Sequence, residues 1–259
     1  MLKVFKIGGQ IINDDKLLTK FLTLFSKIEG DKVLIHGGGK LASNLAEQLS
    51  IPVKMIDGRR ITDEATLKVT VMTYAGWINT TLVGKLNALD CAAIGLTGAD
   101  GNLIEAHKRI HQTIDYGFVG DIFGVKTNFL FRLINFGYLP VIAPITMDSS
   151  GQLLNTNADT IATEIAVACA VDKDVELYFI FDQPGLMRDI KDKTSLISTI
   201  KVSEVPNLKS EQIISDGMIP KIDNAVYGIQ KRIRKVTFTN IDGLESILSG
   251  LIAGTKIIK

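Results

Sequence analysis

The sequence predicts an α/β protein, namely a three-layer αβα sandwich with a mainly parallel central sheet, arranged in two lobes. Short runs rich in Val, Ile, Leu and Phe are almost continuously hydrophobic, which is typical of strands covered on both faces of a parallel sheet. Segments with apolar residues at helical spacing lie between these runs, and such alternation favours a sandwich. The length of 259 residues allows one large domain or two small lobes around a shared core.

The predicted strands and helices alternate along the chain. The strands are residues 2–7, 32–36, 91–97, 138–142, 175–181 and 235–239. The helices are residues 14–27, 40–49, 62–89, 127–135, 158–170, 220–229 and 244–251. The expected N-caps are Asn13 or Asp14, Thr62 and Asn157, and Gly137 is expected to end one helix.

Two segments suggest how the chain is divided. Residues 98–124 alternate polar and apolar side chains around several glycines, so we predict β-hairpins inserted over one end of the sheet, with a lid as one role. A predicted helix ends in a charged turn at residues 171–174 before a new strand begins. We therefore expect an N-terminal lobe of residues 1–172 and a C-terminal lobe of residues 173–259.

Composition excludes several classes of protein. The 29 Lys and Arg residues balance 28 Asp and Glu residues at a net charge of +1, so nothing predicts a nucleic acid or membrane partner. No window approaches the ~18 apolar residues of a membrane span, and no signal region precedes Lys6. Cys91 and Cys169 lack the spacing of a zinc site and indicate buried thiols in a reducing compartment. We expect a cytoplasmic protein.

Lys6 ends the first predicted strand, on the same face as Leu2 and Val4. A buried ammonium group is costly unless an anion meets it. Gly8 and Gly9 follow at once, so bare amides can lie beside this ammonium, and ligands of open α/β sheets collect at the carboxyl ends of strands. The alternative is that Lys6 reaches solvent before an ordinary turn.

A second glycine cluster, residues 37–39, lies between a predicted strand and a predicted helix. Exposed amides at a helix N-terminus form an anion site, although three glycines can also form a simple tight connection. The spacing is neither GxGxxG nor GxxxxGK[ST], so neither a dinucleotide fold nor a P-loop is supported. His36 is interpreted as a packing and hydrogen-bonding residue, because no other His or Cys stands at ligand spacing.

Four further side chains are candidates for binding anions. Asn155, beside a helix start, and the adjacent Arg59 and Arg60 can hold a carboxylate. Pro220 at the first helical position puts Lys221 in the first turn, where a cation opposes the helix dipole unless it faces a polyanion. For each of these residues, a solvated surface position is the alternative.

Six motifs in one order resemble the amino acid kinase family, and within it the enzymes that phosphorylate N-acetyl-L-glutamate. The motifs are residues 6–9 (KIGG), 36–39 (HGGG), 58–63 (GRRITD), 117–121 (GFVGD), 155–159 (NTNAD) and 216–221 (DGMIPK). The resemblance runs from residue 2 to GTKI at residues 254–257, so it covers essentially the whole chain.

The resemblance implies transfer of a phosphoryl group from ATP to the side-chain carboxylate of N-acetyl-L-glutamate, a step of arginine biosynthesis. It implies an N-terminal lobe for the amino acid and a C-terminal lobe for the nucleotide. Mg²⁺ would be bound mainly through ATP oxygens and water, with no metal-binding side chain. It also implies a homodimer formed through residues 62–89.

The resemblance further assigns roles to residues of this chain. The catalytic residues would be Lys6 and Lys221, which neutralise the transferring group, and Asp159, which holds both lysines. The amides of Gly8, Gly9, Gly38 and Gly39 would bind phosphate oxygens. The amino acid substrate would contact Arg60, Asn155, Gly38 and Gly39. The nucleotide would contact Asp182, Gly185, Met218 and Lys221.

Three alternatives remain open. Positions such as Lys40 and Trp77 depart from the family pattern near the amino acid pocket, so N-succinyl-L-glutamate is an alternative acceptor. Another acceptor of the family, such as carbamate or free glutamate, is a second. A sensor that keeps the fold without turnover is a third, although such a sensor would not need Lys6, Asp159 and Lys221.

Overall fold

The computed structural model describes residues 1–56, 59–189, 191–192, 194–214 and 217–259. An eight-stranded sheet runs through the molecule in the order β12-β14-β13-β11-β1-β2-β8-β5. Every neighbouring pair in it is parallel except β13 and β14, so the predicted mainly parallel sheet is confirmed. The strands are β1 (Leu2–Ile7), β2 (Asp31–His36), β5 (Ala93–Leu96), β8 (Leu139–Ile142), β11 (Val175–Ile180), β12 (Thr199–Lys201), β13 (Lys235–Thr239) and β14 (Thr255–Ile258).

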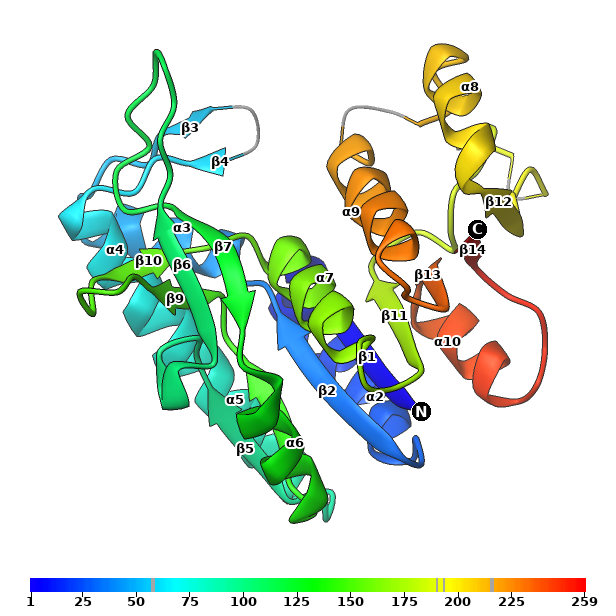
Figure 1. The fold of residues 1–259 in the computed structure, drawn as a ribbon, viewed down its shortest axis with the longest axis horizontal. Helices are drawn as coiled ribbons and strands as arrows, with labels where there is room; N and C mark the ends of the chain where they lie inside the picture. Colours follow the sequence, from blue (N-terminus) through cyan, green and yellow to red (C-terminus); the bar gives the residue numbers. More distant parts are fainter. Residues whose placement is uncertain (57–58, 190, 193, 215–216) are drawn as a thin grey trace.

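Helices cover both faces of this sheet and complete the three predicted layers (Figure 1). One face carries α6 (Thr127–Asn135), α7 (Ala158–Cys169), α8 (Val205–Ser210) and α9 (Ile219–Gln230). The opposite face carries α1 (Gly9–Asn13), α2 (Asp15–Ser26), α3 (Gly39–Gln48), α4 (Glu64–Val71), α5 (Asn79–Asn87) and α10 (Ile241–Leu248). None of the described helices is long and apolar enough to cross a membrane.

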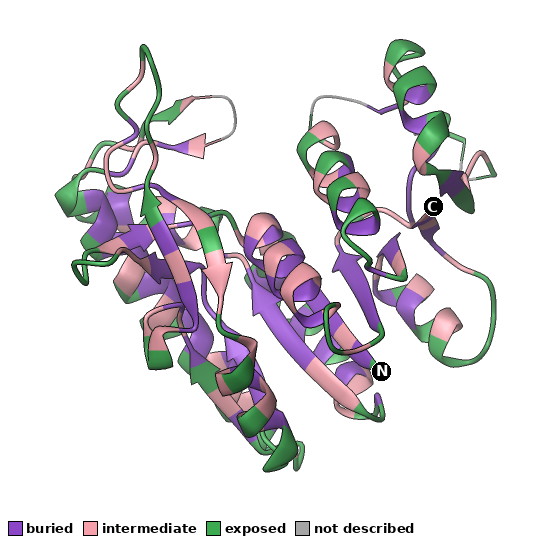
Figure 2. Ribbon diagram, viewed as in Figure 1, coloured by how far each residue is buried: buried purple, intermediate pink, exposed green. Residues whose placement is uncertain are grey.

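Two hydrophobic cores lie on the two faces of the sheet. Alternate residues of a strand point to opposite faces, so Leu2 and Val4 of β1 join one core and Phe5 and Ile7 join the other. Figure 2 shows the central strands as buried along most of their length. The near-continuous hydrophobic runs in the sequence are therefore strands covered on both faces, as predicted.

All six predicted strands are present, with bounds that differ from the prediction by two residues or fewer. Of the β-hairpins predicted in residues 98–124, the structure has one antiparallel pair, β6 (Ile104–Lys108) and β7 (Gly120–Val125), after a 3₁₀ turn, η2 (Asp100–Asn102). It belongs to a separate four-stranded sheet with β9 (Ile145–Met147) and β10 (Leu153–Asn155). Its role as a lid stays a prediction, as does the lobe boundary at residues 171–174.

The predicted helix over residues 62–89 is continuous but not uniform. A π-helical segment, η1 (Met72–Ile78), separates α4 from α5, and nothing in the sequence pattern predicts it. The N-cap is Asp63, whose carboxylate accepts a hydrogen bond from the Thr66 amide at 2.8 Å. The prediction of Thr62 as the cap is wrong, because Thr62 is extended and bridges to Gly117.

Other predicted helix ends are confirmed or corrected locally. The side chains of Asp14 and Asn157 cap α2 and α7, and Gly137 follows α6 with φ of 84°. Pro220 is the second residue of α9 rather than the first, which leaves Lys221 in the first turn. Gly9, expected in a loop, already begins the short helix α1.

Several short elements escaped prediction. They are β12, β14, β9, β10, α8, a 3₁₀ turn η3 (Val202–Glu204) and a two-stranded ribbon of β3 (Met55–Ile56) and β4 (Arg59–Arg60). Each is too short to show a period in the sequence, and the ribbon exists only because its strands pair with each other. The ribbon is nevertheless important, because it carries two arginines to the site described below.

Candidate active site

The glycine segments after β1 and β2 meet the N-terminus of α7 at the carboxyl ends of the strands. They enclose a hollow of about 250 Å³. Its lining residues are Lys6, Gly9, Gly37, Gly38, Gly39, Met55, Arg59, Arg60, Tyr74, Val119, Pro144, Asn155, Thr156, Asn157, Ala158 and Asp159. Seven residues expected to form one site therefore border one space: Lys6, Gly9, Gly38, Gly39, Arg60, Asn155 and Asp159.

Asp159 joins two lysines that are far apart in the chain. Lys6 Nζ lies 2.7 Å from Asp159 Oδ1, and Lys221 Nζ donates to Asp159 Oδ2 at 2.7 Å. Lys6 is 9% exposed and Asp159 is 7% exposed, so the Lys6 ammonium has the buried anionic partner that its position requires. Asp159 lies at the start of α7 and Lys221 in the first turn of α9. The cluster with Lys6 therefore joins β1, α7 and α9 at one point.

Electrostatics keep this cluster ionised. Burial disfavours the Asp159 carboxylate, but the charges of Lys6 and Lys221 outweigh burial and lower its pKa to about 2. The carboxylate also lies in the first turn of α7, where the helix dipole favours an anion. With two ammonium groups for one carboxylate, the cluster is left with one positive charge beside the hollow.

The glycine loop after β2 is shaped by close contacts. A Cβ atom at Gly38 would collide with the Ile78 side chain and would approach the Tyr74 ring to 3.0 Å. Gly39 begins α3, so its N–H has no acceptor within the helix. Among the described residues, none accepts a hydrogen bond from the Gly38 amide. The loop thus presents amide donors at a helix N-terminus, as an anion site requires.

The first glycine segment differs from the second. The Gly8 N–H donates to the Ile180 carbonyl at 3.0 Å, and Gly8 does not line the hollow. Gly9 lines the hollow and begins α1, so the amide available there belongs to Gly9. The pairing of β1 with β11 continues for one more residue, so the Gly8 N–H is already bonded and is not available to a ligand.

Arg60 and Asn155 both line the same hollow. Arg60 Nη2 donates to the Gly39 carbonyl at 2.9 Å and to Ser43 Oγ at 2.8 Å. Asn155 Nδ2 donates to Thr62 Oγ1 at 3.0 Å. These bonds hold both side chains in place, and no described carboxylate pairs with Arg60. Its remaining N–H groups are suited to a ligand carboxylate.

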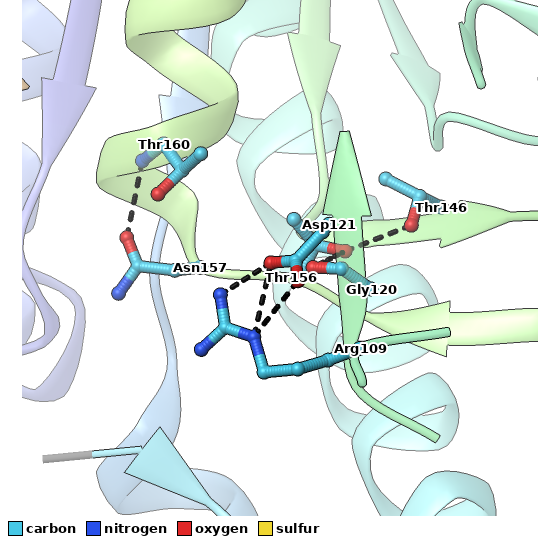
Figure 3. Close-up of polar contacts among 7 residues, drawn as sticks. All are labelled: Arg109, Gly120, Asp121, Thr146, Thr156, Asn157 and Thr160. Atoms are coloured by element: carbon cyan, nitrogen blue, oxygen red, sulfur yellow. Dashed lines mark hydrogen bonds and ion pairs between the residues drawn. The ribbon is translucent and has the colours of Figure 1, made fainter. Parts of the chain in front are cut away.

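Strand β7 of the hairpin packs against α7, and polar contacts connect the residues around it (Figure 3). Arg109 Nε lies 3.0 Å from both carboxylate oxygens of Asp121, one strand across. Thr146 and Thr156 share a hydrogen bond of 2.8 Å between their hydroxyls. Asn157 accepts from the Thr160 amide at 3.1 Å. These contacts fix the segment that carries Asn155 and Asp159.

None of the expected nucleotide residues lines this hollow, although Lys221 is paired with Asp159, which does. Met218 precedes α9 as its N-cap residue. Asp182 borders another hollow, of about 190 Å³, together with Gln10 and Asn240. Gly185 is buried, and a Cβ atom there would come within 2.6 Å of Thr255 Oγ1. Packing alone therefore explains why a glycine occupies this position.

Some site features lie beyond sequence reasoning. Gly58 and Asp216, which belong to two of the motifs, lie outside the described residues. Tyr74 lines the hollow from the π-helical segment, and burial raises the pKa of its hydroxyl. Nothing in the sequence pattern separates Tyr74 from an ordinary core residue. Within the described ranges, no three acidic, His or Cys side chains are grouped as a metal site would need.

The chain is similar to known proteins along most of its length. The model of the amino acid kinase family matches residues 1–240. A protein of Cytophaga hutchinsonii named acetylglutamate kinase is 44% identical over 99% of this chain and 98% of its own length. One of Phocaeicola vulgatus with the same name is 47% identical over 92% and 93%. The crystal structure of smu.665 from Streptococcus mutans has a TM-score of 0.78 at 24% identity, covering 99% of this chain and 98% of that one.

Proposed function

The chain belongs to the amino acid kinase family, and we propose that it is an acetylglutamate kinase. It phosphorylates the side-chain carboxylate of N-acetyl-L-glutamate with ATP, a reaction of arginine biosynthesis. The observation that carries the proposal is the Lys6–Asp159–Lys221 cluster beside free amides, with Arg60 lining the same hollow. Positive charge and amide donors thus surround a space that fits a small anionic substrate.

The reaction needs little covalent chemistry from the protein. A side-chain carboxylate oxygen of the substrate attacks the γ-phosphorus of ATP, the bond from phosphorus to the β,γ-bridging oxygen breaks, and ADP leaves with that electron pair. The products are ADP and an acyl phosphate. A carboxylate is ionised near neutral pH, so no general base is required. The main tasks are positioning and stabilisation of negative charge.

Each task has a proposed residue. Lys6 and Lys221 neutralise charge on the transferring phosphoryl group, while Asp159 keeps the two ammonium groups apart and oriented. The amides of Gly9, Gly38 and Gly39 bind phosphate oxygens. Arg60 and Asn155 bind the α-carboxylate of the amino acid. Gly8 supports the loop through its bond to Ile180.

The nucleotide is proposed to lie along the carboxyl ends of β11 and β13, between Asp182 and the start of α9 at Met218. Gly185 shapes the loop there by its contact with Thr255. Mg²⁺ is proposed to bind through ATP oxygens and water, where it offsets phosphate charge, since the described residues offer no grouped metal ligands. We also propose the two lobes of residues 1–172 and 173–259 and a cytoplasmic location.

One observation favours a second acceptor, N-succinyl-L-glutamate. Arg59 lines the hollow beside Arg60 on the β3–β4 ribbon. Among the residues that the structure describes, none forms an ion pair with Arg59, whereas Arg109 is paired with Asp121. The succinyl group ends in a carboxylate that acetyl lacks. Arg59 is a suitable partner for this third carboxylate.

ADP formation with different acceptors tests these proposals. The purified protein is mixed with MgATP and N-acetyl-L-glutamate, N-succinyl-L-glutamate, free glutamate or carbamate at equal concentrations, and hydroxylamine traps any acyl phosphate. We expect trapped product with N-acetyl-L-glutamate and none with free glutamate or carbamate. Undetectable ADP formation with both acylated glutamates would favour a binding module without turnover instead.

An Arg59→Leu variant separates the two acylated substrates. If Arg59 binds a succinyl carboxylate, kcat/KM for N-succinyl-L-glutamate falls more than about tenfold, because one charged hydrogen bond is lost. The value for N-acetyl-L-glutamate should stay within about threefold. Equal changes for both substrates would contradict a role for Arg59 in acyl recognition.

A further inference from the structure

His36 has no part in the chemistry proposed above, yet it lies directly before the glycine loop. It is the last residue of β2 and has no exposed surface. Both ring nitrogens have partners. Nδ1 lies 2.8 Å from the carbonyl oxygen of Gly37, and Nε2 lies 3.1 Å from Nδ2 of Asn79. The ring therefore connects the loop to the helix that follows the π-helical segment.

The partners determine where the imidazole proton sits. Asn79 Nδ2 also donates to the Val141 carbonyl at 2.9 Å, so the atom that faces His36 is the amide nitrogen and not its oxygen. An amide nitrogen only donates, so Nε2 of His36 must accept. Nδ1 then carries the proton and donates to the Gly37 carbonyl. Burial and the nearby Lys6 charge lower the pKa of His36 to about 4, although the bond to Gly37 by itself would raise it. The ring is therefore neutral.

The bond to Gly37 sets the direction of the next amide. The C=O of Gly37 and the N–H of Gly38 belong to one planar trans peptide, in which they point in opposite directions. Since His36 draws the carbonyl into the core, the Gly38 N–H points away from the core. Gly38 lines the hollow, and no described residue accepts from its amide.

The helix side of this network is equally constrained. Asn79 begins α5 immediately after the π-helical segment, and its side chain fills the space that a Cβ atom at Gly95 would occupy. Tyr74 and Ile78 from the same segment press on Gly38. A π-helical turn holds more residues than an α-helical turn and changes the direction of the side chains around it. The continuous helix of η1 and α5 thus contacts the loop region through three residues, Tyr74, Ile78 and Asn79.

We propose that His36, held by Asn79, is a positioning residue for phosphoryl transfer that aims the Gly38 amide at the anionic oxygens in the hollow. The inference rests on the proposed function and adds a residue to it. Removal of one amide donor at a developing oxyanion costs about 10²–10³ in rate, so the orientation of this peptide matters for turnover.

Two substitutions of His36 distinguish positioning from packing. In His36→Asn the side-chain amide can lie near the former Nδ1 and donate to Gly37. In His36→Gln it reaches the former Nε2 and leaves that carbonyl without a donor. We expect kcat to fall by about 10- to 100-fold in His36→Gln and by less than about fivefold in His36→Asn. The KM for the amino acid should stay within about threefold in both variants.

The matched control is His111→Gln, on the exposed hairpin loop away from the hollow, which should leave kcat unchanged. Thermal unfolding checks that each variant is folded. Equal kcat losses in His36→Asn and His36→Gln would overturn the proposal, because packing alone would then explain both.

Nitrogen-15 NMR of the wild-type histidines tests the proposal even if a variant fails to fold. The chain has only three His residues, so assignment is simple. We expect His36 to be protonated at Nδ1 and not to titrate between pH 5 and 9. An Nε2–H tautomer would overturn the proposal. Wild-type turnover is measured separately, so the proposed function and this inference can fail independently.

Discussion

Lys6 illustrates how a single residue reports on a site. Its ammonium is almost completely buried at the end of β1, and Asp159 and Lys221 complete a cluster with excess positive charge. A buried ion pair is weak grounds for a stabilising role, because desolvation offsets much of the attraction. The cluster is better explained by the anion that it can bind.

Replacement of either lysine by methionine tests this explanation. Lys6→Met and Lys221→Met keep side-chain length but remove the positive charge proposed to neutralise the transferring group, so each should lower kcat by about 10²–10³. Steady-state kinetics and thermal unfolding measure both effects. Lys20→Met is the control, because the Lys20–Asp242 pair is exposed and contributes little. Activity losses no larger than in that control would contradict the assignment.

Arg60 should act on binding rather than on turnover. Arg60→Ala removes the proposed bidentate partner of the α-carboxylate in both the ground state and the transition state, so the KM for the amino acid should rise by about 10- to 100-fold. We expect kcat to change by less than about threefold. Arg60→Lys should be intermediate, since a lysine keeps the charge without the fork. A loss confined to kcat would show that Arg60 serves the transferring group instead.

At the scale of elements, the glycine loop and the π-helical segment form one unit. Ile78 and Tyr74 occupy the space beside Gly38, so each element determines the other's backbone path. The sequence pattern predicts only a loop and an ordinary helix for these two elements. Their interdependence explains why a glycine is needed there, beyond any need for a bare amide.

A substitution at Gly38 tests this unit. In Gly38→Ala the new methyl group collides with Ile78. This overpacking should lower the free energy of unfolding by about 1–3 kcal/mol and remove most of the activity. Gly84→Ala is the control: Gly84 lies inside α5 with nothing near its would-be Cβ, so stability should rise by about 0.5–1 kcal/mol. Urea unfolding and kcat give both readouts. An active, unperturbed Gly38→Ala protein would refute the close packing.

At the scale of the whole molecule, His36 links stability to pH. Its pKa is about 4 when folded and about 6.5 when unfolded, so the unfolded chain binds the proton between these values. Its contribution is complete above pH 6.5 and is lost as the pH falls through 4. A shift of about 2.5 units corresponds to about 3 kcal/mol.

Urea unfolding between pH 7 and pH 4 measures this dependence. The wild-type protein should lose about 3 kcal/mol more than His36→Asn over that range, because asparagine does not titrate. Asp159, with a pKa of about 2, adds a further loss only below about pH 4 in both proteins. Identical pH slopes in the two proteins would show that His36 is not buried in its neutral form.

The proposed homodimer is also a property of the whole molecule. Along the helix proposed as the interface, Met72 is 50% exposed and Trp77 is 69% exposed. Trp77→Asp puts a charge at that interface, so light scattering should report a dimer for the wild type and a monomer for the variant. Phe136→Asp, at an exposed apolar position after α6, is the control and should stay dimeric. A wild-type monomer would contradict the proposal.

The sequence by itself determined six strands of the large sheet, most helices, a cap at Asn13 or Asp14, the cap at Asn157, and the need of Lys6 for an anionic partner. These follow from hydrophobic period and local hydrogen bonding, which are properties of neighbouring residues. The tertiary structure alone decided that the Gly8 amide donates to the Ile180 carbonyl, that α4 and α5 are joined through a π-helical segment, and that Asn79 holds His36. Whether a polar group is free or bonded depends on partners that are distant in the chain, and no local pattern records them.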